Sequence, residues 1–390
     1  MNNRGRGDAG REKRWLIVAG FGVSPETREQ IARGAAPRIE YLSLQSEVAA
    51  ELIGQSDHFA RNLGRHRRKA VNLASAIQAF RRRRDFDVIY TTGEDVSFWL
   101  APLLRRAGWR GRLITVVHNC GSDTARKLMR FMPKGPQDVF VCFCGEQQRI
   151  LVEELGVPVE NAVCVTNPND YEFFRPSAKA ESPCVFAAGA ERRDYRTLVE
   201  AAAGLDIPFR ISASGPLAEA IGPNQAPPNV SILPRRVSYA EIKALYDSAR
   251  LIVVPLYPSN YAAGVNGILE GMAMGKPLVV SDSVGIAEYV KDGETGRVVP
   301  AGDPAALRAA IEDLWSDPER CAEIGRRNRD WIMRHAPISS YCSRLRALAG
   351  DPAAGLANAP AAARPDPAPA PAYSDLTELQ ETGLAGGLPS

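Results

Sequence analysis

The segment with the clearest chemical potential in this 390-residue sequence is residues 260–290, NYAAGVNGILEGMAMGKPLVVSDSVGIAEYV. Small residues open it, and a predicted helix that carries Glu270 follows. Backbone N–H groups at a helix N-terminus that small side chains leave uncrowded bind a pyrophosphate or sugar hydroxyls. A carboxylate about two turns into such a helix accepts hydrogen bonds from ribose hydroxyls. The residues predicted to form this binding site are Ala263, Gly264, Val265, Asn266 and Glu270.

Glu270 has a second interpretation, as a solvated carboxylate on the exposed face of its helix. Its neighbours are apolar on nearly every side, which favours the binding role; they are Ile268, Leu269, Met272 and Ala273.

Other candidates directly follow predicted strands, where open α/β sheets bind their ligands. His118 ends the strand over residues 113–117, and an imidazole there can donate a hydrogen bond to a sugar hydroxyl or move a proton near neutral pH. Glu94 follows another strand and either orients an acceptor or caps the next helix. Gly20 and Gly22 follow the first strand, at a turn where acceptor or donor can approach the backbone. His118 and Glu94 are therefore the candidate catalytic residues.

The elements that must position these residues follow from short apolar runs that alternate with helix-sized amphipathic stretches. This alternation predicts parallel sheets with helices on both faces. The predicted strands cover residues 15–20, 38–44, 88–92, 113–118, 139–144 and 162–166, and then 184–188, 209–213, 230–233, 251–255, 277–281 and 296–299.

The strand pattern breaks at residues 167–176 (NPNDYEFFRP), which contain two prolines and turn-forming Asn and Asp. We therefore predict two Rossmann-like doubly wound α/β domains that face a central cleft. The predicted divisions are a disordered basic leader over 1–14, an N-terminal acceptor domain over 15–170, a C-terminal nucleotide-sugar domain over 171–349, and a disordered Ala/Pro-rich tail over 350–390.

The segment with Glu270 resembles the retaining GT-B glycosyltransferases of family 4. The family pattern has two glutamates eight positions apart, then an Ala-Met-Ala-Cys-Gly-Lys-Pro-like run, a buried strand and a Gly-Ile-Pro-Glu-like turn. This sequence has Glu270, then GMAMGKP, and later GIAE ending at Glu288 and the turn DGETG at 292–296. The resemblance implies a GT-B fold, with a final helical stretch from about 304 to 348 that crosses back to the front domain. It also implies transfer with retention of configuration.

The resemblance assigns roles to particular residues. Glu270 should hold the ribose, and His118 should lie near the reacting carbon of the donor sugar. Family members carry Arg and Lys after the strand that here reads VFAAGAERR, and we assign the neutralisation of the donor diphosphate to Arg193, with Arg192 as its substitute and a surface arginine as the alternative. The sequence departs from the pattern at Ala262, which replaces the first glutamate, and at Ala190; the first change affects the expected sugar specificity.

Composition excludes several classes of site. The seven cysteines form no CxxC pair and there are four histidines, so we predict buried reduced thiols, no metal and no cofactor. The sequence contains neither GxGxxG nor a Walker-type lysine loop, which disfavours a dinucleotide or P-loop site. The apolar run at 15–23 is too short to span a bilayer, and no cleavage pattern follows it. We therefore expect a cytoplasmic protein.

Residues 1–170 contain 26 Lys and Arg against 19 Asp and Glu, so the N-terminal half is the basic half. The runs at 65–69 and 81–84 favour either peripheral contact with an anionic membrane at the inner face of the plasma membrane or ordinary solvated helix ends. No stacking aromatics accompany the charge, which disfavours nucleic acid.

The sequence thus predicts a glycosyltransferase, and a hexosyltransferase in particular. Its expected partners are a UDP-, GDP- or ADP-sugar donor and a glycan, lipid-linked or small-molecule acceptor. Two alternatives stay open at this stage: a non-catalytic or weakly active GT-B subunit, which Ala262 and Ala190 favour, and a sugar-nucleotide epimerase, which needs more carboxylates and histidines in the cleft.

Overall fold

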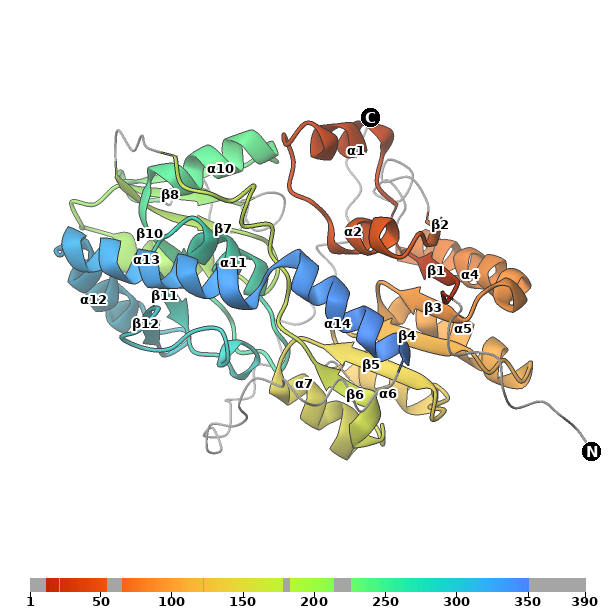
Figure 1. Cartoon of the computed structure of the whole chain (residues 1–390). Helices are drawn as coiled ribbons and strands as arrows, with labels where there is room; N and C mark the ends of the chain where they lie inside the picture. Colours follow the sequence, from red (N-terminus) through yellow and green to blue (C-terminus); the bar gives the residue numbers. More distant parts are fainter. Residues whose placement is uncertain are drawn as a thin grey trace, which may run out of the picture.

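A computed structural model describes residues 12–20, 22–54, 65–121, 123–177, 183–213 and 226–350, with only the backbone described at 65–68 and 123–124. Most of the predicted leader, and the predicted tail after residue 350, lie outside these ranges, as do Phe21 and the side chains of residues 65–68. The described chain forms two six-stranded parallel sheets, one after the other along the sequence (Figure 1). This confirms the predicted α/β class with two doubly wound units. We call them the front domain (β1–β6) and the rear domain (β7–β12).

The front sheet has the strand order β2-β1-β3-β4-β5-β6, and every neighbouring pair is parallel. Its strands are β1 (Trp15–Val18), β2 (Glu51–Ile53), β3 (Val88–Thr91), β4 (Arg112–Val116), β5 (Asp138–Cys142) and β6 (Ala162–Cys164). Its helices are α1 (Pro25–Ala32), α2 (Glu40–Glu47), α4 (Arg65–Arg82), α5 (Glu94–Arg106), α6 (Asp123–Phe131) and α7 (Gly145–Arg149), with shorter turns η1 (Arg83–Asp85), η2 (Ile150–Glu154) and η3 (Val159–Asn161).

The rear sheet has the order β12-β11-β10-β7-β8-β9 and is also parallel throughout. Its strands are β7 (Cys184–Ala188), β8 (Phe209–Ser212), β9 (Val230–Leu233), β10 (Ala249–Val254), β11 (Leu278–Ser281) and β12 (Gly296–Val299). The helices of this half of the chain are α8 (Tyr195–Ala202), α10 (Tyr239–Ser248), α11 (Val265–Ala273), η4 (Val284–Ile286), α12 (Pro304–Trp315), α13 (Pro318–His335) and α14 (Ile338–Gly350).

Both sheets are buried on their two faces, which is why their strands are almost continuously apolar. In β1, Leu16 packs in a cluster with α4 and α5, whereas Ile17 packs on the opposite face with α2 and α14. The second of these clusters continues into the rear domain, through residues such as Phe186 and Ile268. One apolar core therefore joins the two domains along this side of the molecule.

The strand predicted at residues 38–44 is wrong, because this segment forms helix α2. Tyr41 and Leu44, which are its buried residues, lie three positions apart and share one face of a helix. The strand of this region comes later, as the three-residue β2, of which only Ile53 is buried. A short edge strand carries too few apolar residues to produce a readable pattern.

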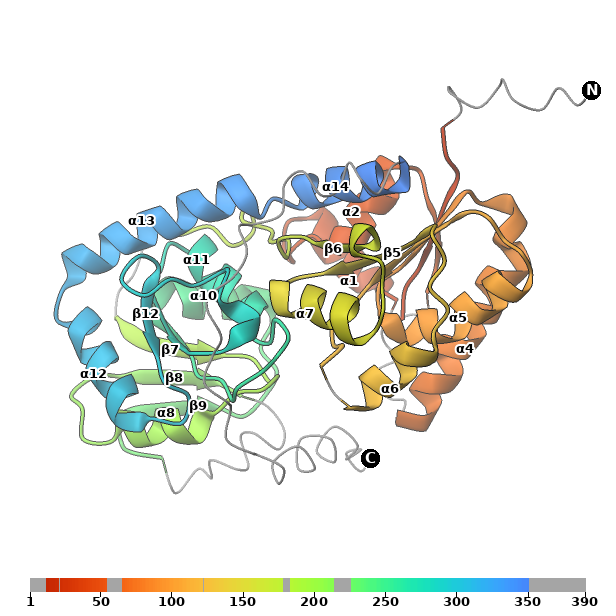
Figure 2. The same ribbon diagram turned by 90° about the horizontal axis from the view of Figure 1, so that it is seen from below.

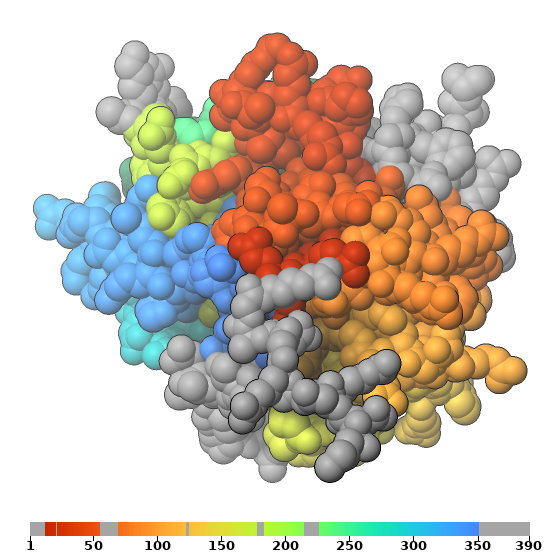
Figure 3. All heavy atoms as spheres, turned by 45° about the vertical axis from the view of Figure 1, so that its right-hand side comes forward, coloured from red at the N-terminus to blue at the C-terminus, as the bar shows by residue number. Residues whose placement is uncertain are grey.

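The last two helices cross from the rear domain to the front domain, as the resemblance implies. Figure 2 shows α13 and α14 running end to end along one side of the molecule. Helix α14 packs against α2, and Figure 3 shows this blue end of the chain beside the red N-terminal region. The hydroxyls of Tyr341 on α14 and Tyr90 on β3 are 3.2 Å apart and hydrogen-bonded.

Other contacts also join the two domains. The N–H of Gly145 donates to Glu288 at 2.7 Å, and the hydroxyl of Tyr289 donates to the carbonyl of Phe143 at 2.6 Å. The predicted boundary at residues 170 and 171 falls in the connection between β6 and β7. Within the described ranges, no helix is long and apolar enough to cross a bilayer, and no three His, Cys, Asp or Glu side chains group as a metal site. All seven cysteines are buried and unpaired.

Candidate donor site and the loop that faces it

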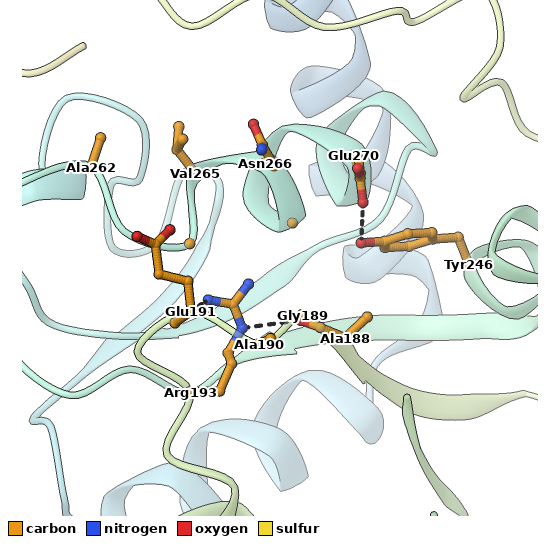
Figure 4. A pocket seen from close by; sticks show the side chains of 12 residues that line it. Ala188, Gly189, Ala190, Glu191, Arg193, Tyr246, Ala262, Val265, Asn266 and Glu270 are labelled. Carbon is orange, nitrogen blue, oxygen red and sulfur yellow. Dashed lines mark hydrogen bonds between the residues drawn. The ribbon is translucent and has the colours of Figure 1, made fainter. Parts of the chain in front are cut away.

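A pocket of about 200 Å³ opens in the rear domain where β7 ends and α11 begins (Figure 4). It collects most of the residues predicted to bind the donor. Its lining consists of Ala188, Gly189, Ala190, Glu191, Arg193, Tyr246, Ala262, Gly264, Val265, Asn266, Gly267 and Glu270. The one predicted donor residue absent from this lining is Ala263, which is only 1% exposed.

Arg193 is the buried cation of this pocket, with only 4% of its surface exposed. Its Nε donates to the carbonyl of Ala188 at 3.0 Å, and its Nη1 donates to the carbonyl of Glu191 at 2.9 Å. These carbonyls orient the guanidinium, but they carry no charge, and no carboxylate among the described residues forms an ion pair with it. A buried arginine is ordinarily paired. Arg193 therefore provides a positive charge inside the pocket that no direct ion pair within the described ranges engages, and Glu270 is the carboxylate on which its charge acts.

Two glycines allow the guanidinium to lie where it does. Gly189 has φ +108° and Gly264 has φ +81°, both in the region that favours glycine. A Cβ atom at Gly189 would lie 2.6 Å from Nη2 of Arg193, and one at Gly264 would lie 2.9 Å from Nη1. Side chains at these positions would displace the arginine.

The N-terminus of α11 faces the same pocket. Gly264 is its N-cap and no side chain caps the helix. Val265 and Ile268 donate their N–H groups to the carbonyls of Ala262 and Gly264. Because the first four N–H groups of a helix have no partner inside it, those of Asn266 and Gly267 are left to bind a ligand, and the helix dipole adds partial positive charge there.

Glu270 lies on the same helix, one turn past Asn266, and receives a hydrogen bond of 2.8 Å from the hydroxyl of Tyr246 (Figure 4). Burial raises the pKa of Glu270 to about 7, although the hydrogen bond from Tyr246 and the charge of Arg193 oppose this shift. Tyr246 donates to one carboxylate oxygen, so the other oxygen is available to accept from a ligand hydroxyl. The alternative of a fully solvated Glu270 does not fit this position.

His118 and Glu94 lie in the front domain and do not line this pocket. They contact each other directly: Glu94 accepts from the N–H groups of His118 and Asn119, at 2.9 and 3.1 Å. The loop that continues from His118 reaches the rear domain, where Asn260 donates to the carbonyl of Gly121 at 3.2 Å. The structure thus brings Arg193 and Glu270 into one pocket and His118 onto an exposed loop that touches the rear domain.

Gly20 and Gly22 are buried and do not line the pocket either. The N–H of Gly20 donates to the hydroxyl of Thr92 at 3.3 Å, and a Cβ at Gly20 would lie 3.3 Å from a carboxylate oxygen of Asp95. Asp95 in turn accepts from Asn72 at 2.6 Å. These contacts explain a small residue at position 20, while its predicted role toward a substrate stays a prediction.

Sequence reasoning missed three residues of these sites: Tyr246, Gln147 and Glu40. Each lies in a helix that carried no motif, and only tertiary packing brings it to the site. Tyr246 donates to Glu270, and Gln147 donates to the carbonyls of Val117 and His118. Burial raises the pKa of Glu40, at the start of α2, and the charge of His118 opposes that rise.

Comparison with known proteins finds a family match in the rear domain. Residues 185–317 match the family described as glycosyl transferases group 1. The chain is 36% identical over 137 residues to the D-rhamnosyltransferase WbpZ of Pseudomonas aeruginosa, covering 33% of this chain and 34% of that protein. It is 31% identical over 121 residues to a GDP-mannose-dependent phosphatidylinositol monomannoside mannosyltransferase of Mycolicibacterium smegmatis, covering 30% and 32%. The chain thus spans about a third of the length of these curated relatives.

Solved structures extend the similarity to both domains. A sucrose-phosphate synthase from Thermosynechococcus elongatus aligns with a TM-score of 0.67 at 15% identity, covering 86% of this chain and 98% of that one. Anabaena Alr3699/HepE in complex with UDP-glucose aligns with a TM-score of 0.62 at 14% identity, covering 85% and 98%. Identities this low establish the fold alone. The chain is a member of the GT-B fold, and its rear domain carries the glycosyl transferases group 1 signature over residues 185–317.

Proposed function

We propose that this protein is a glycosyltransferase that binds a nucleotide-sugar donor in the rear-domain pocket and transfers its sugar to an acceptor held by the front domain. The observation that carries the proposal is the buried guanidinium of Arg193, which has no carboxylate partner among the described residues and lies against the N-terminus of α11. A buried positive charge beside a helix N-terminus fits a diphosphate better than any neutral ligand.

Different residues of the pocket bind different parts of the donor. The guanidinium of Arg193 and the N–H groups of Asn266 and Gly267 bind the diphosphate and stabilise the negative charge that develops as the sugar leaves. Glu270 accepts hydrogen bonds from the ribose hydroxyls. In this scheme the protein's own positive groups neutralise the negative charge of the diphosphate leaving group.

The acceptor enters from the front domain, where the loop of His118 contacts Asn260 of the rear domain. His118 hydrogen-bonds a sugar hydroxyl near the reacting carbon, and transfer proceeds with retention of configuration, as the family resemblance implies. Ala262 and Ala190 replace larger family residues in the pocket lining, which leaves more room beside the donor sugar.

The donor class can be found by thermal-shift screening of the purified protein against UDP-, GDP- and ADP-sugars. One nucleotide class should raise the melting temperature, because a ligand that binds only the folded state stabilises it. One relative bears a name that mentions GDP-mannose, and a structural neighbour contains UDP-glucose, so both classes belong in the first screen.

Catalysis is then tested by following donor hydrolysis and transfer with the responding nucleotide-sugar. Turnover by the wild type that is lost in Glu270→Ala supports the proposal. Binding without turnover would favour the non-catalytic subunit, and conversion of the donor into an epimer would favour the epimerase. Hydrolysis that Glu270→Ala retains would contradict the role of Glu270.

We also propose cytoplasmic location with contact at an anionic membrane surface, which suits a lipid-linked acceptor. On α6, Leu128 is 48% exposed and Phe131 is 85% exposed, and the exposed cations Lys127 and Arg130 share that helix. Exposed apolar residues among cations are typical of an interfacial helix. Binding to vesicles with phosphatidylserine, lost in a Leu128→Ser/Phe131→Ser variant, tests this; equal binding by that variant would contradict it.

A further inference from the structure

The proposed function places His118 next to the sugar without explaining how an exposed histidine keeps one orientation. We propose that Glu94 and Gln147 are positioning residues that hold His118 as the tautomer with its proton on Nε2, so that Nδ1 accepts a hydrogen bond from a sugar hydroxyl. This inference rests on the proposed function for the identity of the ligand. The arrangement of the protein groups is independent of it.

Both carboxylate oxygens of Glu94 accept hydrogen bonds from the loop that contains His118. Oε2 accepts from the N–H of His118 at 2.9 Å, and Oε1 accepts from the N–H of Asn119 at 3.1 Å. Glu94 is the first residue of α5, yet no side chain caps that helix. Burial raises the pKa of Glu94, and both the charge and the N–H of His118 oppose the rise. The side chain of Glu94 therefore braces the loop and does not cap α5, while its predicted role toward an acceptor stays a prediction.

Gln147 holds the same loop from the other side. This side chain is completely buried in the first turn of α7. Its Nε2 donates to the carbonyls of Val117 and His118 at 3.1 and 2.9 Å, and its Oε1 accepts from the N–H of Phe143 at 3.1 Å. Since carbonyls only accept and an N–H only donates, the amide has one possible orientation. The backbone of His118 is thereby bonded at both its N–H and its C=O.

The ring of His118 has a third anchor. Nε2 lies 2.8 Å from the carbonyl oxygen of Thr92, and because that oxygen only accepts, Nε2 must carry the proton. The ring also packs against Phe143, with centroids 5.7 Å apart. Among the described residues no group forms a hydrogen bond with Nδ1, and the side chain is exposed. In the neutral ring, Nδ1 is then an acceptor that is ready for a hydroxyl.

Glu40 and Glu94 are the carboxylates whose interaction with His118 the structure records, from α2 and α5. The backbone contacts of His118 fix the orientation of its ring. Because only a neutral imidazole has two tautomers, the tautomer is measured at a basic pH.

The first experiment records imidazole ¹⁵N shifts of the labelled full-length protein at pH 8. The sequence has four histidines, so His118→Gln identifies the signals of this ring by their loss. The wild type should give the separated shifts of a single Nε2–H tautomer, and Glu94→Ala and Gln147→Leu should move them toward the average of two tautomers. Averaged shifts in the wild type would overturn the proposal, whatever reaction the protein catalyses.

Gln148→Leu is the matched control, because Gln148 is the next residue of α7 and donates to Ala162 instead of the loop. It should leave the His118 shifts unchanged. A melting temperature within a few degrees of the wild type, measured for each variant, separates loss of the brace from loss of the fold.

The second experiment measures transfer kinetics with the donor found by the screen. Glu94→Ala and Gln147→Leu should lower kcat about 10- to 100-fold and change the donor KM less than about 3-fold, because a displaced catalytic group costs rate more than binding. Glu94→Gln keeps one carbonyl acceptor and should fall between Glu94→Ala and the wild type. An unchanged kcat in Gln147→Leu, or Glu94→Gln as impaired as Glu94→Ala, would contradict the positioning role.

Discussion

Both domains have polar residues just after the ends of their parallel strands. These polar groups differ in whether the protein itself provides their hydrogen-bond partners. In the rear domain, Arg193 and the first turn of α11 face the pocket with positive charge, and no carboxylate of the described chain forms a direct ion pair with that arginine. In the front domain, the backbone of His118 is bonded by Glu94 and Gln147, and its ring by Thr92. The first arrangement suits a site that receives an anion, and the second suits a loop that must present one side chain.

This difference shows how two domains of the same fold can serve two purposes, ligand binding in one and the positioning of a side chain in the other. Unsatisfied donors in a buried site are costly unless a ligand completes them, so they indicate binding. Polar groups that satisfy one another fix a geometry before any ligand arrives. The predictions below test each half of the comparison, beginning with the largest effect.

Removing the charge of the rear pocket should have the largest effect. Arg193→Met should weaken donor binding by about 100-fold or more, because a buried charge-assisted contact to phosphate is lost. Calorimetry with the donor found by screening measures this. The control is Arg196→Met, since Arg196 is exposed and paired with Glu200. A donor affinity in Arg193→Met within about 3-fold of the wild type would remove the basis of the comparison.

Glu270→Gln should separate binding from stability. Donor affinity should fall about tenfold, which corresponds to about 1.4 kcal/mol, because an amide offers one acceptor oxygen where the carboxylate offers two. In the wild type, affinity should also fall as the pH drops below about 7, where Glu270 takes up its proton, and the variant should lack this dependence. A sugar diphosphate ester is the suitable ligand because it has no proton that titrates in this range.

The same variant should be more stable than the wild type at pH 8. Burial raises the pKa of Glu270 from 4.5 to about 7, so the folded protein binds this proton more tightly than the unfolded chain. The stability that comes from the protonated carboxyl is full below about 4.5 and is lost as the pH rises through about 7. The melting temperature of Glu270→Gln should exceed that of the wild type at pH 8 and match it at pH 5. Equal melting temperatures at both pH values would show that Glu270 is solvated.

Gly264→Ala tests the close approach of the guanidinium. Gly264 has φ +81°, and an L-residue with this φ lowers the free energy of unfolding by about 1–2 kcal/mol. The Cβ of the new alanine would also press on Arg193. Gly293→Ala is the control, because Gly293 has φ +76° and nothing within 4 Å of an added Cβ. Denaturant unfolding should show a loss for both variants, and a larger one for Gly264→Ala because its Cβ would also lie 2.9 Å from Cδ2 of the buried Leu256. Only Gly264→Ala should also weaken donor binding.

The smallest effect belongs to the contact between the domain connection and α11. Asn167 donates to the side chain of Asn266 at 2.8 Å. Asn167→Ala should raise the donor KM about 2- to 5-fold, since a single neutral hydrogen bond contributes about 0.5–1.5 kcal/mol. A double-mutant cycle with Asn266→Ala isolates this hydrogen bond, and strictly additive effects would show that the bond does not contribute to donor binding.

The sequence by itself determined the two parallel sheets, because strands buried on both faces must be apolar throughout and glycine and proline mark where they end. It also identified most of the residues that line the rear pocket on α11, since the N-terminus of this helix and the carboxylate on it lie close together in the chain. Local spacing was enough for these residues because a single helix carries most of them.

Only the tertiary structure decided the partners of those residues. Tyr246 is 24 positions before Glu270, and Gln147 is 29 positions after His118, and neither distance leaves a periodic signal. Likewise, the strand predicted over α2 failed because β2 is short and lies at the sheet edge. Hydrogen bonds between distant segments depend on how helices pack over a sheet, whereas apolar periodicity records only which face of each element is buried.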